Sequence, residues 1–227
     1  MPEPSIRAFT EPTDPPVRGF LHVPEIPNHH ALVLTHGAGA NAQSPLLIAL
    51  AETFSAAGFT VLRCDLPYRQ IRSFGPPGPA DAARDRAGLR NAIAAMRKII
   101  SGPIFLGGHS YGGRQSSMLA AEEKDLAAGL LLLSYPLHPP RKPEQQRTQH
   151  LPDLHTPALF VHGTRDPFGT IAEIEQALKM IPAKTKLLAI EGAGHDLGFK
   201  GKAGREGLPR SVFSAFLHFT RYDSRTS

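Results

Sequence analysis

The chain has 227 residues, of which 41% are hydrophobic and 20% are charged, values that fit one globular domain with a sizeable core. The formal net charge is +5 at pH 7, with a pI near 9.6. The lysines and arginines are scattered and not interleaved with aromatic residues, so the charge does not predict nucleic-acid binding.

The first half of the chain predicts strands that alternate with helices. The opening residues are rich in proline and polar groups, after which apolar runs of strand length are separated by helix-forming segments and glycine-rich loops. The expected elements are a strand at 19–23, a strand at 31–35, a helix at 45–57, a strand at 60–64 and a long helix at about 80–100.

The second half continues this alternation, apart from a polar, proline-rich segment at 136–157. Strands are expected at 104–106, 129–133, 158–161 and 186–190, and helices at 114–123, 171–180 and 209–220. Such alternation predicts an α/β fold with a mostly parallel sheet and helices on both faces. We expect one domain at 19–220, an N-terminal extension at 1–18 and a C-terminal tail at 221–227.

One serine stands between glycines where an expected strand meets a helix. Gly108-His109-Ser110-Tyr111-Gly112 matches G-x-S-x-G, the nucleophile elbow. A chain that passes directly from strand to helix turns sharply, which forces the apex residue toward a left-handed backbone and requires small neighbours. The alternative is a plain glycine-rich turn, so the motif gains meaning only if a base and an acid accompany Ser110.

A candidate base and a candidate acid for Ser110 are both found in loops that follow later strands. His195 lies in the glycine-rich loop after the strand at 186–190, and Asp166 follows the strand at 158–161. The order serine, aspartate, histidine is the one associated with the elbow motif. Asp196 is the weaker candidate acid, because a residue adjacent to the histidine rarely reaches across its ring.

A loop of small residues follows the strand at 31–35 and reads His36-Gly37-Ala38-Gly39-Ala40-Asn41. Its backbone N–H groups can face a site without obstruction by side chains. We therefore expect the amides of Ala38 and Tyr111 to form an oxyanion hole. A nucleotide-binding loop is the alternative, but neither G-x-G-x-x-G nor a phosphate-loop lysine is present.

Polar residues near these motifs leave two interpretations open. Asp65, Tyr68 and Arg69 follow a strand, and either contact substrate or form a structural ion pair. His109 either lines the pocket or packs beneath the elbow. No metal site is expected, because His29 and His30 lack partners at the spacing of metal ligands.

Together these motifs resemble the α/β-hydrolase superfamily over residues 19–220, in particular its small, cap-poor members near dienelactone hydrolase. The stretches THGAGAN, RCDLPYR and GGHSYGGRQSSMLAAE are most similar to a little-characterised group that includes a testis-expressed protein and a domain of a histone-acetyltransferase-complex subunit. Dienelactone hydrolases carry a cysteine nucleophile where this chain has Ser110, so their substrate is not implied. The resemblance implies an open site without a separate lid domain, for which 136–157 is the one candidate cover.

The sequence thus predicts a serine hydrolase of a small-molecule ester or thioester that needs no cofactor. A non-catalytic scaffold and a small peptidase are the alternatives, because fold does not select a chemistry. The single Cys64 excludes an internal disulfide and favours a reducing compartment. No secretory signal is visible, and the apolar run at 126–133 is too short to cross a bilayer, so we expect a cytoplasmic protein without a membrane partner.

Overall fold

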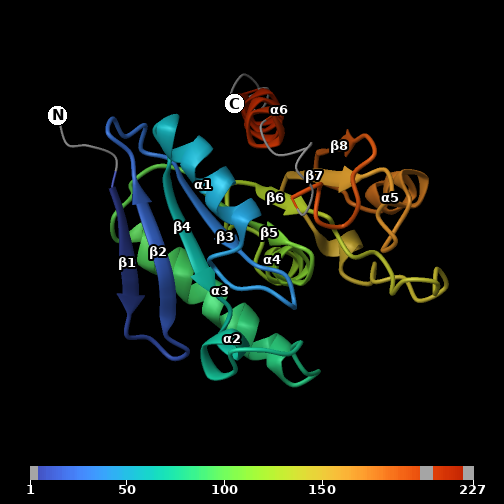
Figure 1. Ribbon diagram of the computed structural model, residues 1–227, viewed down its shortest axis with the longest axis horizontal. Helices are drawn as coiled ribbons and strands as arrows, with labels where there is room; N and C mark the ends of the chain where they lie inside the picture. The colour runs from blue at the N-terminus through green and yellow to red at the C-terminus, as the bar shows by residue number, and fades with distance from the viewer. Residues whose placement is uncertain (1–4, 200–206, 222–227) are drawn as a thin grey trace.

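The computed structural model describes residues 5–199 and 207–221. Eight strands form one sheet in the order β1-β2-β4-β3-β5-β6-β7-β8, which runs across Figure 1 from the blue N-terminal strands to the orange C-terminal ones. The pairs β1/β2 and β2/β4 are antiparallel and all others are parallel. The strands are β1 (Ser5–Glu11), β2 (Val17–Val23), β3 (Ala31–Thr35), β4 (Thr60–Asp65), β5 (Ile104–His109), β6 (Leu130–Leu133), β7 (Ala158–Gly163) and β8 (Thr185–Ile190).

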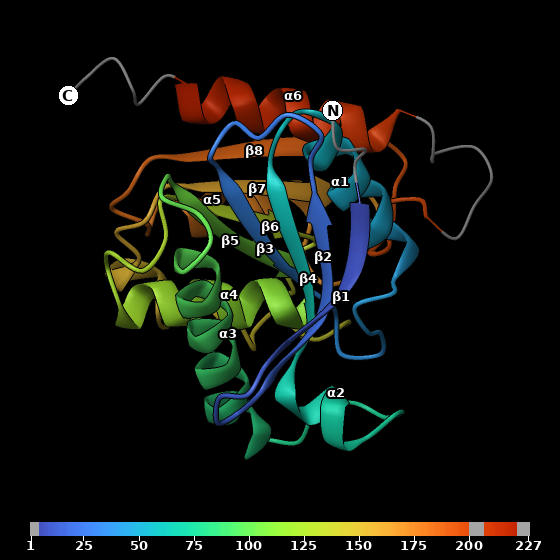
Figure 2. The same ribbon diagram turned by 90° about the vertical axis from the view of Figure 1, so that its left-hand side faces the viewer.

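Helices cover both faces of the sheet, as the alternation of the sequence predicts, and the predicted fold class is confirmed. Figure 2 shows α6 on one side of the strands and α3 and α4 on the other, and α1 packs beside α6. Within the described residues, no helix is long and apolar enough to cross a membrane. The helices are α1 (Pro45–Ala56), α2 (Pro67–Ile71), α3 (Asp81–Arg97), α4 (Tyr111–Glu122), α5 (Ile171–Leu178) and α6 (Leu208–Arg221), with a 3₁₀ turn η1 (Leu151–Asp153).

The alternation of side chains along each strand builds two separate apolar layers. In β3, Leu32 and Leu34 pack in the layer under α1 and α6, whereas Ala31 and Val33 pack in the layer under α3, α4 and α5. All four side chains are fully buried. Because β3 and β5 lie in the middle of this double core, the loops at their carboxyl ends have a rigid base.

The sheet begins earlier than the sequence analysis predicted. Residues 5–11, placed there in an N-terminal extension over 1–18, form the edge strand β1, which pairs with β2 along its whole length. Its residues are almost all exposed, so no apolar alternation marked it as a strand. Helix α2 was also missed, because five residues carry no helical period. Of the expected tail, residues 222–227 lie outside the described residues.

The proline-rich segment 136–157, the one candidate for a cover over the site, packs against α4 instead. Tyr135 donates a hydrogen bond to the carbonyl of Arg147 (2.7 Å), and His150 lies 2.8 Å from the hydroxyl of Ser117 on α4. Leu151 and Leu154 are buried in the core. The segment therefore extends the core beneath α4, and none of its residues lines the cavity described below.

Candidate active site

Ser110 occupies the sharp turn between β5 and α4. Its φ is 51°, in the left-handed region that the motif requires, and it is the residue directly before the first turn of α4. A Cβ on Gly108 would lie 2.7 Å from the carbonyl oxygen of Thr35, and one on Gly112 would lie 2.5 Å from that of His36. The glycines therefore let the turn pack directly on the end of β3.

The structure brings Ser110, Asp166 and His195 together, although Asp166 follows Ser110 by 56 residues and His195 follows Asp166 by 29. The Nε2 atom of His195 lies 2.8 Å from the hydroxyl of Ser110, and its Nδ1 lies 2.8 and 3.0 Å from the two carboxylate oxygens of Asp166. A carboxylate only accepts hydrogen bonds, so Nδ1 carries the proton and Nε2 is free to accept one from Ser110. This is the arrangement of a nucleophile, a base and an orienting acid.

Asp196, the weaker candidate acid, has a different position. Its Oδ1 accepts a hydrogen bond from the backbone N–H of Gly198 (3.1 Å), within the turn that follows His195. The carboxylate hydrogen-bonded to Nδ1 of the histidine is that of Asp166, which is fully buried. The geometry therefore favours Asp166 as the orienting acid.

Phe168 also contacts the histidine, and the sequence analysis did not single it out. Its ring lies 4.2 Å from that of His195, at an interplanar angle of 31°. Its backbone N–H donates to Oδ1 of Asp166 (2.9 Å), and its carbonyl accepts from the N–H of His138 (3.1 Å). The stretch GTRDPF contained this aromatic residue two positions after the acid, which is the signal that could have identified it.

His109 lines the cavity and joins the two strands that carry the serine and the histidine. Its Nε2 lies 2.7 Å from the backbone carbonyl of His195, to which it donates a hydrogen bond. Burial lowers the pKa of His109 to about 4, so the ring is neutral near pH 7. The neutral ring of His109 therefore links the His195 loop to the elbow by a hydrogen bond and adds no positive charge beside His195.

The loop 36–42 lies beside the elbow, and two side chains that follow β4 donate hydrogen bonds to its carbonyl groups. The carbonyl of Ala38 accepts from the hydroxyl of Tyr68 (2.9 Å) and from Nη2 of Arg69 (3.0 Å), and that of Ala40 accepts from Nε of Arg69 (2.8 Å). In the described part of the chain, no group accepts a hydrogen bond from the amides of Ala38 or Tyr111. With respect to residues 5–199 and 207–221, both predicted oxyanion donors are thus available.

These contacts give the polar residues after β4 a structural role that differs from the expected ion pair, since they bind backbone groups of the loop. Tyr68 and Arg69 are buried and bind loop carbonyls, and Asp65 accepts a hydrogen bond from the N–H of Ala42 (2.7 Å). Buried His36, whose pKa is lowered by desolvation, accepts at Nε2 from the N–H of Leu66 (3.1 Å). The group holds the loop in place, and Arg69 alone of the three also lines the cavity.

A cavity of about 840 Å³ opens above Ser110 and His195, a volume typical of small-molecule sites. Its apolar lining includes Leu46, Phe168 and Phe199, and the loop residues 37–41 also line it. The remaining lining residues are Gln43, Ser44, Pro45, Arg69, Ser73, His109, Pro167 and Asp196.

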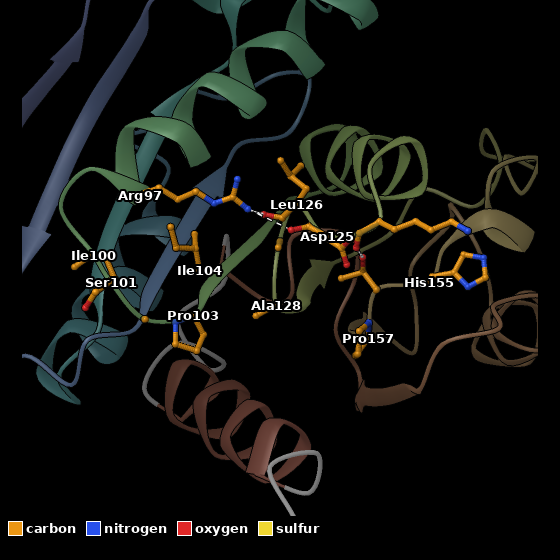
Figure 3. Close-up of a pocket in the computed structure, with 14 residues that line it drawn as sticks. Arg97, Ile100, Ser101, Pro103, Ile104, Asp125, Leu126, Ala128, His155 and Pro157 are labelled. Carbon is orange, nitrogen blue, oxygen red and sulfur yellow. Dashed lines mark hydrogen bonds between the residues drawn. The ribbon is translucent and has the colours of Figure 1, made fainter. Parts of the chain in front are cut away.

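A second cavity, of about 640 Å³, lies at the opposite edge of the sheet, where β5, β6 and β7 begin (Figure 3). Arg97 points toward the start of β6, where its guanidinium donates to the carbonyls of Asp125 (3.2 Å) and Leu126 (2.7 Å). His155 lies on the far side of this cavity. Because no predicted site residue lines it, the candidate active site is the cavity above Ser110.

Comparison with known proteins identifies one matching family and several solved structures with the same fold. The family described as an alpha/beta hydrolase domain matches residues 28–212. A dienelactone hydrolase from Anabaena variabilis is 21% identical, with a TM-score of 0.75 over 95% of this chain and 98% of its own. A serine hydrolase homologue from Coxiella burnetii is 16% identical (TM-score 0.73; 91% and 95% covered), and a serine hydrolase without a lid from Xanthomonas campestris is 15% identical (TM-score 0.67; 96% and 94%). At these identities the structures establish a shared fold.

The buried histidines predict acid sensitivity. Burial lowers the pKa values of His22, His109 and His150 to about 4, whereas an unfolded histidine has a pKa of about 6.5. Between these values the unfolded chain binds more protons, so the free energy of unfolding should be greatest above about pH 6.5 and fall toward pH 4. Urea unfolding at stepped pH measures this loss.

Replacing His109 by glutamine should make the loss smaller, because one of the three histidines is removed while an N–H donor remains. His150→Gln serves as a matched variant distant from the cavity and should reduce the loss in the same way. An identical fall in stability in wild type and both variants would contradict the assignment.

Proposed function

The chain belongs to the alpha/beta hydrolase domain family, and from that premise we propose that it is a serine hydrolase that cleaves a small carboxylic ester or thioester. The observation that carries the proposal is the hydrogen-bonded series from Ser110 through His195 to Asp166. A hydroxyl becomes an effective nucleophile only when a base takes its proton, and that base needs an acid to orient it. The cavity above these side chains supplies room for a small substrate.

In the proposed reaction, Ser110 attacks the substrate carbonyl while Nε2 of His195 takes the hydroxyl proton. Asp166 holds the ring in the required tautomer and stabilises the imidazolium. The leaving alcohol or thiol then departs with the proton returned by His195, which leaves an acyl group on Ser110. Water, deprotonated by the same histidine, hydrolyses this ester to release the acid and restore the serine.

The negative oxygen of each tetrahedral intermediate would lie between the amides of Ala38 and Tyr111. Tyr111 is the first residue of α4, so the positive end of the helix dipole faces the same position. The hydroxyl of Tyr68 is bound to the carbonyls of Gly37 (3.3 Å) and Ala38 (2.9 Å), on both sides of the Ala38 amide, so this amide needs no rearrangement. Donors fixed in advance stabilise developing charge without a reorganisation cost.

The principal alternative is a scaffold that keeps the fold without turnover. The assembled site favours an enzyme, because a scaffold has no physical need for a serine in a left-handed turn beside a base and a buried acid. Within the family, we also propose a place in the cap-poor branch near dienelactone hydrolase, next to the group with the testis-expressed protein and the histone-acetyltransferase-complex domain. A cytoplasmic location likewise stays a prediction from the sequence.

Covalent labelling tests the nucleophile directly. The purified protein should react with a fluorophosphonate probe, because the probe traps a serine that a neighbouring histidine activates. Ser110→Ala should abolish labelling, whereas Ser134→Ala, which changes a buried serine outside the cavity, should retain it. Equal labelling of the Ser110 variant and the wild type would place the nucleophile elsewhere.

Two aspartate variants test the acid. Asp166→Asn should lower kcat by about 10² to 10⁴, because the histidine loses the partner that fixes its tautomer and stabilises its cation. Asp196→Asn should cost about tenfold or less, since its carboxylate caps a turn. Both variants are assayed with one activated ester after circular dichroism has verified folding. A greater loss in the Asp196 variant would reverse the assignment.

Substrate size is the third test. Esters of short acyl groups, up to about C4 to C6, should be preferred, because no segment among residues 5–199 and 207–221 closes over the cavity to bury a longer chain at about 0.8 kcal/mol per methylene. The measurement is kcat/KM for p-nitrophenyl esters from C2 to C12. A kcat/KM that keeps rising to C12 would reveal an apolar channel and contradict the proposal.

A further inference from the structure

Asp85 is a buried carboxylate that the proposed reaction does not use. It lies on α3 with no exposed surface and does not line the cavity. Its Oδ1 accepts a hydrogen bond from the backbone N–H of Tyr68 (3.0 Å), and its Oδ2 accepts one from the hydroxyl of Tyr111 (2.7 Å). One side chain therefore binds the first residue of α4 directly and also binds α2, whose Tyr68 contacts the 36–42 loop.

The two hydrogen bonds of Asp85 begin two branches of contacts, and the first branch runs directly to the elbow. Tyr111 follows the nucleophile, and its amide is one of the two proposed oxyanion donors. Its hydroxyl is fixed to Asp85, so the side chain joins the start of α4 to α3. A displacement of this contact would turn the first residue of α4 and with it the direction of the amide.

The second branch reaches the other donor through one intermediate residue. Asp85 fixes the backbone of Tyr68, and the hydroxyl of Tyr68 donates to the carbonyl of Ala38 (2.9 Å), the residue whose amide is the second proposed donor. The rings of Tyr68 and Tyr111 pack edge to face, with centroids 5.9 Å apart. The two branches thus form one packed unit with the carboxylate at its base.

We propose that Asp85 is the positioning residue of the oxyanion hole: it fixes the Ala38 and Tyr111 amides relative to each other by holding Tyr68 and Tyr111 on one carboxylate. The inference rests on the proposed function insofar as it concerns catalysis. The two amides belong to different loops, after β3 and after β5; these strands pair as far as Thr35 and Gly108, and Asp85 adds a link beyond that pairing. A misplacement of about 1 Å at such a site can cost about 10²-fold in rate.

The burial of Asp85 agrees with this role. Desolvation raises its pKa, and the two hydrogen bonds oppose that rise, so the carboxylate is held by these contacts against an unfavourable environment. An apolar side chain of similar volume would bury at lower cost but would accept neither hydrogen bond. What the carboxylate adds is a pair of acceptors in a fixed, planar geometry.

Three variants of the full chain separate positioning from general stability. Asp85→Ala removes both acceptors and should lower kcat by about 10- to 100-fold with KM changed less than about twofold, because the substrate contacts remain. Asp85→Asn should retain kcat within about fivefold, since Oδ1 still accepts from Tyr68 and the amide group can donate to the Tyr111 oxygen. Ile93→Ala, a core truncation on the same helix, is the control and should leave kcat within about twofold below its unfolding temperature.

Hydrogen exchange of the backbone supplies a readout that does not depend on activity. Peptides covering residues 36–44 and 107–114 should exchange at least about tenfold faster in Asp85→Ala than in wild type, and at the wild-type rate in Asp85→Asn and Ile93→Ala. Tyr111→Phe removes one branch only, so it should accelerate exchange in 107–114 and leave 36–44 unchanged.

The two proposals fail in different ways. If the wild type neither hydrolyses esters nor reacts with a fluorophosphonate, the proposed function is wrong, and faster exchange of both segments in Asp85→Ala still supports the positioning role. If the wild type is active but Asp85→Ala matches Ile93→Ala in kcat and exchange, the positioning role is overturned and the proposed function stands.

Discussion

The direct passage from β5 into α4 is the constraint around which the molecule is arranged. Ser110 holds a left-handed backbone, a conformation that costs about 1–3 kcal/mol for a residue other than glycine and persists only when its surroundings determine it. Here β5 lies between β3 and β6 in the centre of the sheet, and the backbone of Ser110 itself donates to the carbonyl of Leu133 (2.8 Å). The strained turn is thus fixed by the most deeply buried part of the fold.

The sequence predicts the residues whose positions follow from topology. In a parallel sheet the carboxyl ends of the strands meet at one edge, so motifs after β3, β5, β7 and β8 converge there. Ser110, Asp166 and His195 lie in such loops, which is why short motifs and strand order were enough to bring them together. The glycines of GGHSYGG carried the further information that the backbone of one loop packs directly on another.

The sequence could not predict contacts that depend on how side chains of distant elements meet. Asp85 reaches Tyr68 and Tyr111 from α3, over separations of 17 and 26 residues, and nothing in a helical period marks one aspartate as buried. Arg69 binds four backbone carbonyls, so a residue expected to pair with an acid or contact substrate instead holds a loop. Strand β1 was missed for another reason, because five of its seven residues are exposed.

The chain order of these loops has a consequence for synthesis on the ribosome. Ser110, its turn and the 36–42 loop precede residue 115, but Asp166 and His195 follow β7 and β8, and α6 must then cover the strands from which they extend. A nascent chain thus carries an unactivated serine until nearly all of the domain has emerged. In the proposed reaction, acyl transfer is thereby postponed until β8 and the loop with His195 have been synthesised.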